Sequence, residues 1–163
     1  MIIRTADVSD LPAIGAVERD GFPPRERWSE QAWAAEVSGA DRQVQVAEDS
    51  GTVLGVISIQ VLPPTSDLLR VVVAPSARRR GVATRLIDDA LDRAATAGAT
   101  RMLLEVRHDN DPAILCYGRA GFEQLTSRSD YYGRGVDALV MRAWDLQDRP
   151  AARPPWATGA DHG

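Results

Sequence analysis

The chain has 163 residues, 44% of them hydrophobic, which is enough for one compact domain with a core and too few for two. Its formal net charge is -4, so it lacks the overall positive field that would make a nucleic acid its main partner. One cysteine and two histidines rule out an internal disulfide framework, and we expect no metal site.

Residues 1–7 have neither the apolar core nor the small-residue cleavage site of a signal peptide. The chain also contains no apolar run of 18 residues, the length needed to cross a membrane as a helix. We therefore expect a soluble, cytoplasmic protein with no membrane partner.

The first part of the chain predicts a strand followed by two helices. Leu11, Ile14 and Val17 share one face of the first helix, and a run of two prolines ends it. The predicted elements are a strand at residues 2–5, a helix capped by Ser9 or Asp10 that stops before residues 22–24, and a helix from Ser29 to Gly39.

A hairpin and a further strand come next. Residues 43–48 alternate between polar and apolar, residues 49–51 form a turn, and residues 53–62 are rich in β-branched side chains. Two prolines join this hairpin to a strand at residues 67–73.

Apolar residues then recur every four positions and predict a long helix from Gly81 to Gly98. A strand at residues 101–107 follows, and a strand, crossover helix and strand of this kind form a parallel pair. The remaining predicted elements are a short helix from Asn110 to Gly121, an antiparallel pair at residues 122–125 and 138–143, and a disordered proline-rich tail at residues 148–163.

The segment Arg78-Arg79-Arg80-Gly81-Val82-Ala83-Thr84 lies between a predicted strand and the long helix. The first N–H groups of a helix lack partners and its dipole favours negative charge, so a glycine there lets an anion approach closely. Arginines add charge-assisted hydrogen bonds. The pattern predicts a pyrophosphate site; the alternative is a solvated arginine-rich turn. The Gly-x-Gly-x-x-Gly and Gly-Lys-Ser/Thr motifs of NAD and ATP sites are absent.

Glu105 interrupts the apolar run of the strand at residues 101–107, and burying an unpaired carboxylate is costly. Arg107 lies on the same face of the strand, so a structural ion pair between the two is one explanation. A catalytic role is the other. Its position favours catalysis, because Glu105 and Asn110 approach the carboxyl end of a parallel strand, where open sheets bind ligands.

Tyr117 lies about two helical turns after Asn110 and can therefore face the same cleft. The alternative is an ordinary half-buried aromatic side chain. Cys116 points about 100° away from Tyr117 along the helix, and we expect it to be a small buried side chain rather than a nucleophile. We expect His108 to lie in a loop.

These residues together resemble the GNAT acetyltransferases. Arg78-x-x-Gly81-x-Ala83 is similar to the pyrophosphate motif of that family, in which Gln or Arg is followed by two residues, Gly, one residue, and Gly or Ala. The ribosomal-protein-alanine N-acetyltransferases of the RimI type show further similarity over residues 1–145. The matching positions are Asp10-Leu11-Pro12, Trp28-Ser29-Glu30, Leu104-Glu105-Val106-Arg107, Asn110, Ala113, Tyr117, Gly121-Phe122, Arg128, Tyr131-Tyr132 and Asp137-Ala138-Leu139-Val140-Met141.

The resemblance implies an α/β (α+β) protein with the GNAT fold. That fold is a mixed, mostly antiparallel sheet with a splayed central pair of parallel strands and helices on both faces. A single N-acetyltransferase domain at residues 1–147 is expected to precede the tail.

The resemblance also implies roles for individual residues. The backbone of Val71 to Val73 would bind the pantetheine arm of acetyl-CoA and the segment after it the pyrophosphate, while Glu105 would be the general base and Tyr117 the general acid. The residues assigned to acetyl-CoA are Val71, Val72, Val73, Arg78, Arg79, Arg80, Gly81, Val82, Ala83, Thr84 and Asn110. The chain departs from the family pattern in residues 23–27, within a loop that lies near the acceptor in that family.

The implied activity is transfer of an acetyl group from acetyl-CoA, by direct attack, to the N-terminal α-amine of a protein such as an alanine-initiated ribosomal protein. Lysine side chains and small-molecule amines are alternative acceptors, because the pyrophosphate motif says little about the nucleophile. A non-catalytic acyl-CoA-binding module is a further alternative, opposed by the presence of both Glu105 and Tyr117. An RNA-binding domain is opposed by the acidic balance of charge.

Overall fold

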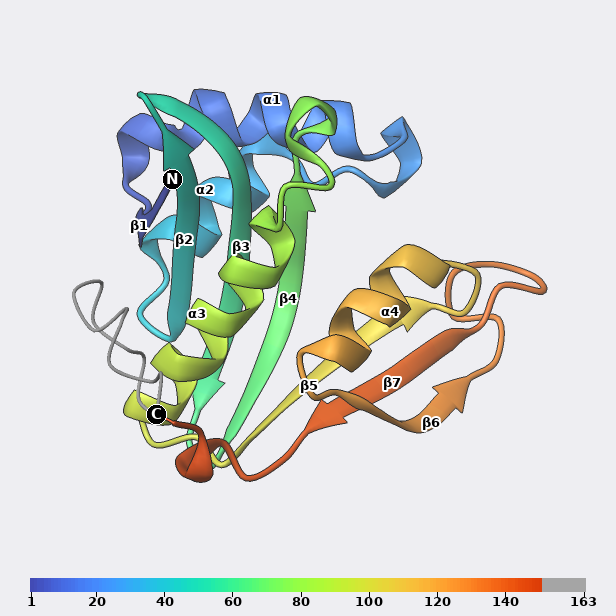
Figure 1. Cartoon of the computed structure of the whole chain (residues 1–163). Helices are drawn as coiled ribbons and strands as arrows, with labels where there is room; N and C mark the ends of the chain where they lie inside the picture. Colours follow the sequence, from blue (N-terminus) through green and yellow to red (C-terminus); the bar gives the residue numbers. More distant parts are fainter. Residues whose placement is uncertain (151–163) are drawn as a thin grey trace.

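One mixed sheet of seven strands organises the protein, in the order β1-β2-β3-β4-β5-β7-β6 (Figure 1). The structure is a computed structural model and describes residues 1–150. Neighbouring strands are antiparallel except for β4 and β5, which are parallel, so the predicted mixed, mostly antiparallel sheet is confirmed. The strands are β1 (Ile2–Thr5), β2 (Arg42–Asp49), β3 (Thr52–Leu62), β4 (Thr65–Val73), β5 (Arg101–Arg107), β6 (Glu123–Arg128) and β7 (Ala138–Ala143).

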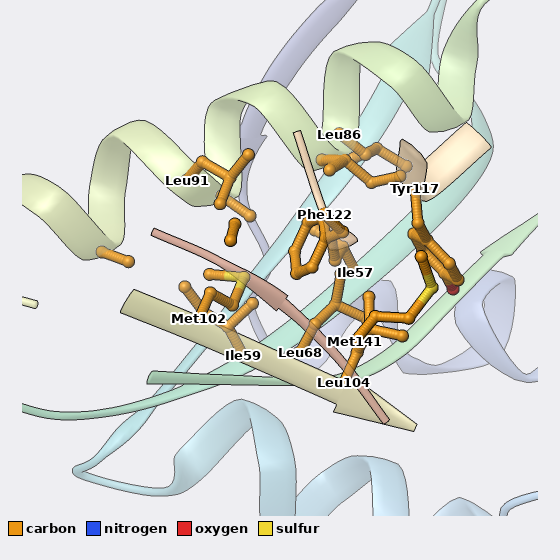
Figure 2. Packing of buried hydrophobic residues seen from close by; sticks show 14 of the residues in the cluster. Ile57, Ile59, Leu68, Leu86, Leu91, Met102, Leu104, Tyr117, Phe122 and Met141 are labelled. Atoms are coloured by element: carbon orange, nitrogen blue, oxygen red, sulfur yellow. The ribbon is translucent and has the colours of Figure 1, made fainter. Parts of the chain in front are cut away.

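Helices cover both faces of the sheet, as predicted. The helices are α1 (Leu11–Gly21), α2 (Glu30–Ser38), α3 (Val82–Thr96) and α4 (Asp111–Arg119). On one face, Ile14 of α1 and Trp33 of α2 pack against Val46 and Val56. On the other face, α3 and α4 bury the larger core cluster, which includes Leu86, Leu91, Met102, Leu104, Tyr117, Phe122 and Met141 (Figure 2).

The two parallel strands part soon after they pair. β4 and β5 are in register only at Thr65–Asp67 and Arg101–Leu103. Val71 to Val73 still pair with β3, but no described residue pairs with their other side. Figure 1 shows the two strands diverging toward their carboxyl ends, beside the beginning of α3. A splayed parallel pair therefore leaves backbone groups of β4 free at the centre of the sheet.

The first helical segment begins differently from the prediction. Asp10 is the N-cap residue of α1, as predicted, but its side chain makes no capping bond to that helix. A 3-10 turn at Val8–Asp10 precedes α1, and its cap is Asp7, whose carboxylate accepts a hydrogen bond from the Ser9 amide at 2.8 Å. Asp10 is buried and is instead bound by Arg4, whose Nη1 and Nη2 lie 2.9 and 2.8 Å from its carboxylate oxygens. The Asp10 carboxylate also accepts from the Asp7 amide at 2.9 Å, which completes a capping box around the 3-10 turn at Val8–Asp10.

The predicted tail begins at Asp148, and most of it, residues 151–163, lies outside the described residues. Asp148 closes a short 3-10 turn at Leu146–Asp148, and Arg149 Nε donates to Asp92 of α3 at 3.1 Å. The described chain is therefore anchored to α3 up to Arg149. Among residues 1–150, no helix combines the length and apolar character needed to span a bilayer.

Candidate active site

The site is built around the first turn of α3. Gly81 precedes the helix with a φ of +74°, in the left-handed region, and a side chain at this position would meet nothing within 4 Å. No side chain caps the helix, and within the described residues no group accepts from the amides of Val82, Ala83 or Thr84. Three N–H donors therefore point out of an open, positively polarised helix end.

The predicted arginines immediately precede this helix end in the chain. Arg78, Arg79 and Arg80 are all exposed. Arg80 lies 3.3 Å from Asp49, whereas Arg78 and Arg79 form no ion pair with any described residue. Free amides and unpaired guanidinium groups are the donors that a diphosphate requires, and the open space at Gly81 lets an anion approach them. The residues present therefore fit the pyrophosphate of acetyl-CoA.

Glu105 lies on β5 next to the diverging strands, but it is less buried than predicted. Its side chain is 28% exposed, and its Oε1 lies 3.1 Å from Nη1 of Arg128, an exposed residue of β6. The alternative ion pair with Arg107 is wrong, because Arg107 binds Glu26 and Asp109 instead. Glu105 is therefore partly exposed to solvent and forms an ion pair with a residue of the edge strand β6.

Other titratable side chains gather about Glu105. Burial raises the pKa of Asp67 on β4, and the nearby Glu105 charge raises it further. A hydrogen bond to Glu105 raises the pKa of Tyr131, while burial followed by the charge of Glu105 raises the pKa of Tyr132. The segment between β6 and β7 thus brings two phenol groups to the candidate base, and both stay protonated at neutral pH.

Tyr117 is more buried than an ordinary half-buried aromatic. It is 9% exposed and packs edge-on against Phe122, with a ring-centroid distance of 5.9 Å. Figure 2 shows it at the end of the core cluster opposite Leu91 and Met102. Burial raises the pKa of the Tyr117 hydroxyl, which therefore remains a hydrogen-bond donor over the physiological range.

The remaining predicted residues have structural contacts of their own. Asn110 is exposed and caps α4, with its Oδ1 accepting from the Ala113 amide at 3.3 Å. Cys116 is only partly buried, and its Sγ lies 4.0 Å from Oγ1 of Thr84 at the start of α3. His108 lies outside the helices and strands, as expected, and its Nδ1 accepts from the Asp137 amide at 2.9 Å.

A buried polar cluster beneath the site was missed by the sequence analysis. Glu18 of α1 accepts hydrogen bonds from Arg70 of β4 and from Trp33 of α2, and Arg70 also binds the backbone of Glu26. One signal was present in the sequence. Glu18 follows Ile14 by one helical turn and therefore lies on the apolar face of α1, where a carboxylate requires a buried partner.

Known proteins are similar to this chain in sequence and in fold. Residues 8–122 match the acetyltransferase (GNAT) family. The chain is 30% identical over 145 residues to the [ribosomal protein bS18]-alanine N-acetyltransferase of Escherichia coli, covering 85% of this chain and 94% of that protein. It is 31% identical over 139 residues to the N-alpha-acetyltransferase RimI of Mycobacterium tuberculosis, covering 82% and 86%. An uncharacterized Mycobacterium leprae protein is 32% identical over 147 residues, but the chain covers only 40% of its length.

The structural comparison leads to the same group of proteins. The crystal structure of the ribosomal-protein-S18-alanine N-acetyltransferase from Escherichia coli superposes with a TM-score of 0.80 and 25% identity, covering 94% of this chain and 96% of that one. The splayed strand pair and the open start of α3 are consistent with the family match. The chain therefore belongs to the acetyltransferase (GNAT) family and is an N-acetyltransferase related to the RimI-type enzymes.

Proposed function

We propose that the protein transfers an acetyl group from acetyl-CoA to the N-terminal α-amine of a protein, with an alanine-initiated ribosomal protein as the preferred acceptor. The proposal depends on the placement of two complementary groups. The partly exposed Glu105 lies on β5 beside the unpaired edge of β4. Tyr117 lies buried on α4, which packs over the same diverging strands. The relatives named above support the choice of acceptor, and the proposed setting is the cytoplasm.

In this proposal the open end of α3 holds the diphosphate of acetyl-CoA. The amides of Val82 to Thr84 and the side chains of Arg78 and Arg79 donate hydrogen bonds to it. The free side of Val71 to Val73 offers backbone groups to the amides of the pantetheine arm. Asn110 already caps α4, so it is a weaker candidate for binding acetyl-CoA than the start of α3.

Glu105 accepts the proton of the attacking amine. Full transfer from a peptide α-ammonium to an ordinary glutamate is uphill by about 5 kcal/mol, because their pKa values differ by about 3.5. The nitrogen becomes far more acidic as its bond to the carbonyl carbon forms. A half-exposed Glu105 suits transfer at that stage, either directly or through a water molecule.

Tyr117 stabilises the leaving sulfur. Acetyl-CoA supplies the acetyl group as a thioester, and the displaced thiolate needs a hydrogen bond in a site that excludes water. Because burial raises the pKa of Tyr117, its hydroxyl is a poor source of a fully transferred proton. We therefore assign it a strong hydrogen bond to the departing sulfur.

An α-amine is the acceptor that this chemistry favours. At neutral pH, a lysine side chain costs about 3.5 kcal/mol more to deprotonate than an α-amine, because its ordinary pKa is near 10.4 rather than 7.8. A larger fraction of an α-amine is therefore neutral and able to attack at neutral pH, and a weak base such as a carboxylate is then sufficient to remove the remaining proton.

Mass spectrometry of two matched peptides tests the proposal. One peptide begins with alanine and has no lysine, and the other has a blocked N-terminus and one internal lysine. We expect acetyl-CoA and the enzyme to add one acetyl group to the first peptide only. Acetylation of the lysine peptide would instead favour a side-chain acceptor, and a lack of thiol release with any amine would favour a non-catalytic binding module.

A further inference from the structure

The residue Glu26 is held by both strands of the splayed pair. It belongs to the segment at residues 22–28, between α1 and α2, which we term the bridging segment. Nη2 of Arg70 on β4 donates to the backbone oxygen of Glu26 at 2.6 Å, and Nη1 of Arg107 on β5 donates to its Oε1 at 2.5 Å. One residue of the bridging segment is thus tied to β4 and β5 where those strands have separated.

Arg70 is itself fixed from beneath. Its Nε and Nη2 lie 3.1 and 2.5 Å from the two carboxylate oxygens of Glu18, a residue that is only 1% exposed. Nε1 of Trp33 donates to the same carboxylate at 3.0 Å. A buried carboxylate with three donors is a rigid anchor, because any movement of Arg70 would leave it unpaired in a nonpolar interior.

The guanidinium of Arg70 also stacks on the bridging segment. Its central carbon lies 3.6 Å from the ring centroid of Phe22 and 5.1 Å from that of Trp28. Arg70 therefore contacts the first residue, the last residue and Glu26 between them. Figure 1 shows the chain after α1 reaching past the carboxyl end of β4, toward the gap beside β5.

The bridging segment lies on the face of the sheet that presents Glu105. Arg107 and Glu105 are two residues apart on β5, so their side chains leave the same face, and Arg107 binds Glu26. The anion site at α3 lies on the opposite face. A segment held over the Glu105 face borders the path of the amine and not the pyrophosphate.

We propose that Arg70 is a positioning residue that holds the bridging segment across the gap between β4 and β5 and thereby sets the affinity for the acceptor. The proposal rests on the function proposed above. A segment that is ordered before the acceptor arrives loses little conformational entropy on binding, whereas a loose one must be ordered at the expense of affinity. Arg70 acts through Glu26, Phe22 and Trp28 and takes no part in the chemistry.

The decisive variant is Arg70→Lys. It keeps a positive charge opposite Glu18 but loses the planar group that bonds Glu26 and stacks on Phe22. With the alanine-initiated peptide, we expect the KM for the peptide to rise about tenfold, with kcat and the KM for acetyl-CoA within about twofold of wild type. Arg4→Lys is the matched control, since Arg4 makes a similar two-pronged contact with the buried Asp10 at the far edge of the sheet.

Trypsin provides a readout that needs no acceptor. Arg25 and Arg27 are exposed residues of the bridging segment, and the chain has no lysine that would add cleavage sites. We expect Arg70→Lys, but not Arg4→Lys, to accelerate cleavage after these two arginines. Glu26→Gln, which weakens the Arg107 contact with the same segment, should raise the peptide KM less than additively when combined with Arg70→Lys.

The outcomes separate this inference from the proposed function. Wild-type enzyme that fails to acetylate the peptide would refute the choice of acceptor, while faster cleavage in Arg70→Lys would still support the positioning role. An active wild type with the same peptide KM in Arg70→Lys would overturn the inference. So would an equal change in Arg4→Lys, or cleavage at wild-type rates in Arg70→Lys.

Discussion

Arg128 reaches across β7 to place its guanidinium 3.1 Å from the carboxylate of Glu105. The two residues belong to β6 and β5, which are separated by β7 in the sheet. Arg128 is 56% exposed, so the pair contributes less than about 1 kcal/mol to stability. The pair brings a positive charge from an edge strand to Glu105, the proposed base.

Removing either proposed catalytic group should slow turnover without weakening coenzyme binding. We expect Glu105→Gln and Tyr117→Phe each to lower kcat by about a hundredfold or more, because proton transfer and thiolate stabilisation contribute effects of that order. Calorimetric affinity for acetyl-CoA should stay within about twofold. Glu123→Gln, a change at an exposed carboxylate of β6, is the control, and wild-type rates in both active-site variants would refute the assignments.

A negative charge at the start of α3 should weaken acetyl-CoA binding. Thr84→Glu places a carboxylate beside three unpartnered amides, where it would compete with the diphosphate, and we expect the Kd to rise at least about tenfold. Thr96→Glu makes the same chemical change at the other, exposed end of α3. Calorimetric titrations should show little change for this control, and equal losses in both variants would contradict the assigned site.

Tyr117 should make the protein less stable in alkali. Burial raises its pKa, so its contribution to stability is fully present below the unfolded pKa of about 10 and is lost as the pH rises through the folded value. Above pH 10, the free energy of unfolding of wild type should fall by about 1.4 kcal/mol per pH unit more than that of Tyr117→Phe. Urea unfolding between pH 8 and about 11.5 measures this, and parallel curves would show that the hydroxyl is not buried.

Gly55 allows α3 to approach the sheet closely. A methyl group there would lie 3.0 Å from the backbone oxygen of Val72 and 3.2 Å from side-chain carbons of Val82 and Leu86. We expect Gly55→Ala to destabilise the protein by about 1–3 kcal/mol in urea unfolding, because the first turn of α3 must move away. Gly118→Ala, on the open surface of α4, should stabilise by up to about 1 kcal/mol, and matching losses in both would rule out the packing explanation.

The fold was predictable where local patterns determine it. The four-residue apolar repeat at Val82, Leu86, Ala90 and Ala94 corresponds to the buried face of α3, and all four are at most 2% exposed. The proline and glycine positions also predicted where most helices and strands begin and end, to within a few residues of their observed ends. Helix periodicity and strand alternation are properties of adjacent residues, which a single sequence displays directly.

The partners of the site residues were not predictable in the same way. The local spacing of Glu105 and Arg107 suggested a pair, yet Glu105 binds Arg128 and Arg107 binds Glu26. Both contacts depend on the order of strands in the sheet and on the path of a loop between helices. Arg70 was likewise counted only as part of a strand, because its partner Glu18 lies far away in the sequence.

The free edge of Val71 to Val73 has a thermodynamic consequence for the whole sheet. A ligand whose amides form hydrogen bonds to that edge would act as an additional strand, so part of the protein's stability would come from a small molecule. Coenzyme at one hundred times its Kd would add about 2.7 kcal/mol to the free energy of unfolding. The melting temperature should then rise with the logarithm of the free coenzyme concentration once that concentration exceeds the Kd, so resistance to heat would depend on how much coenzyme is available.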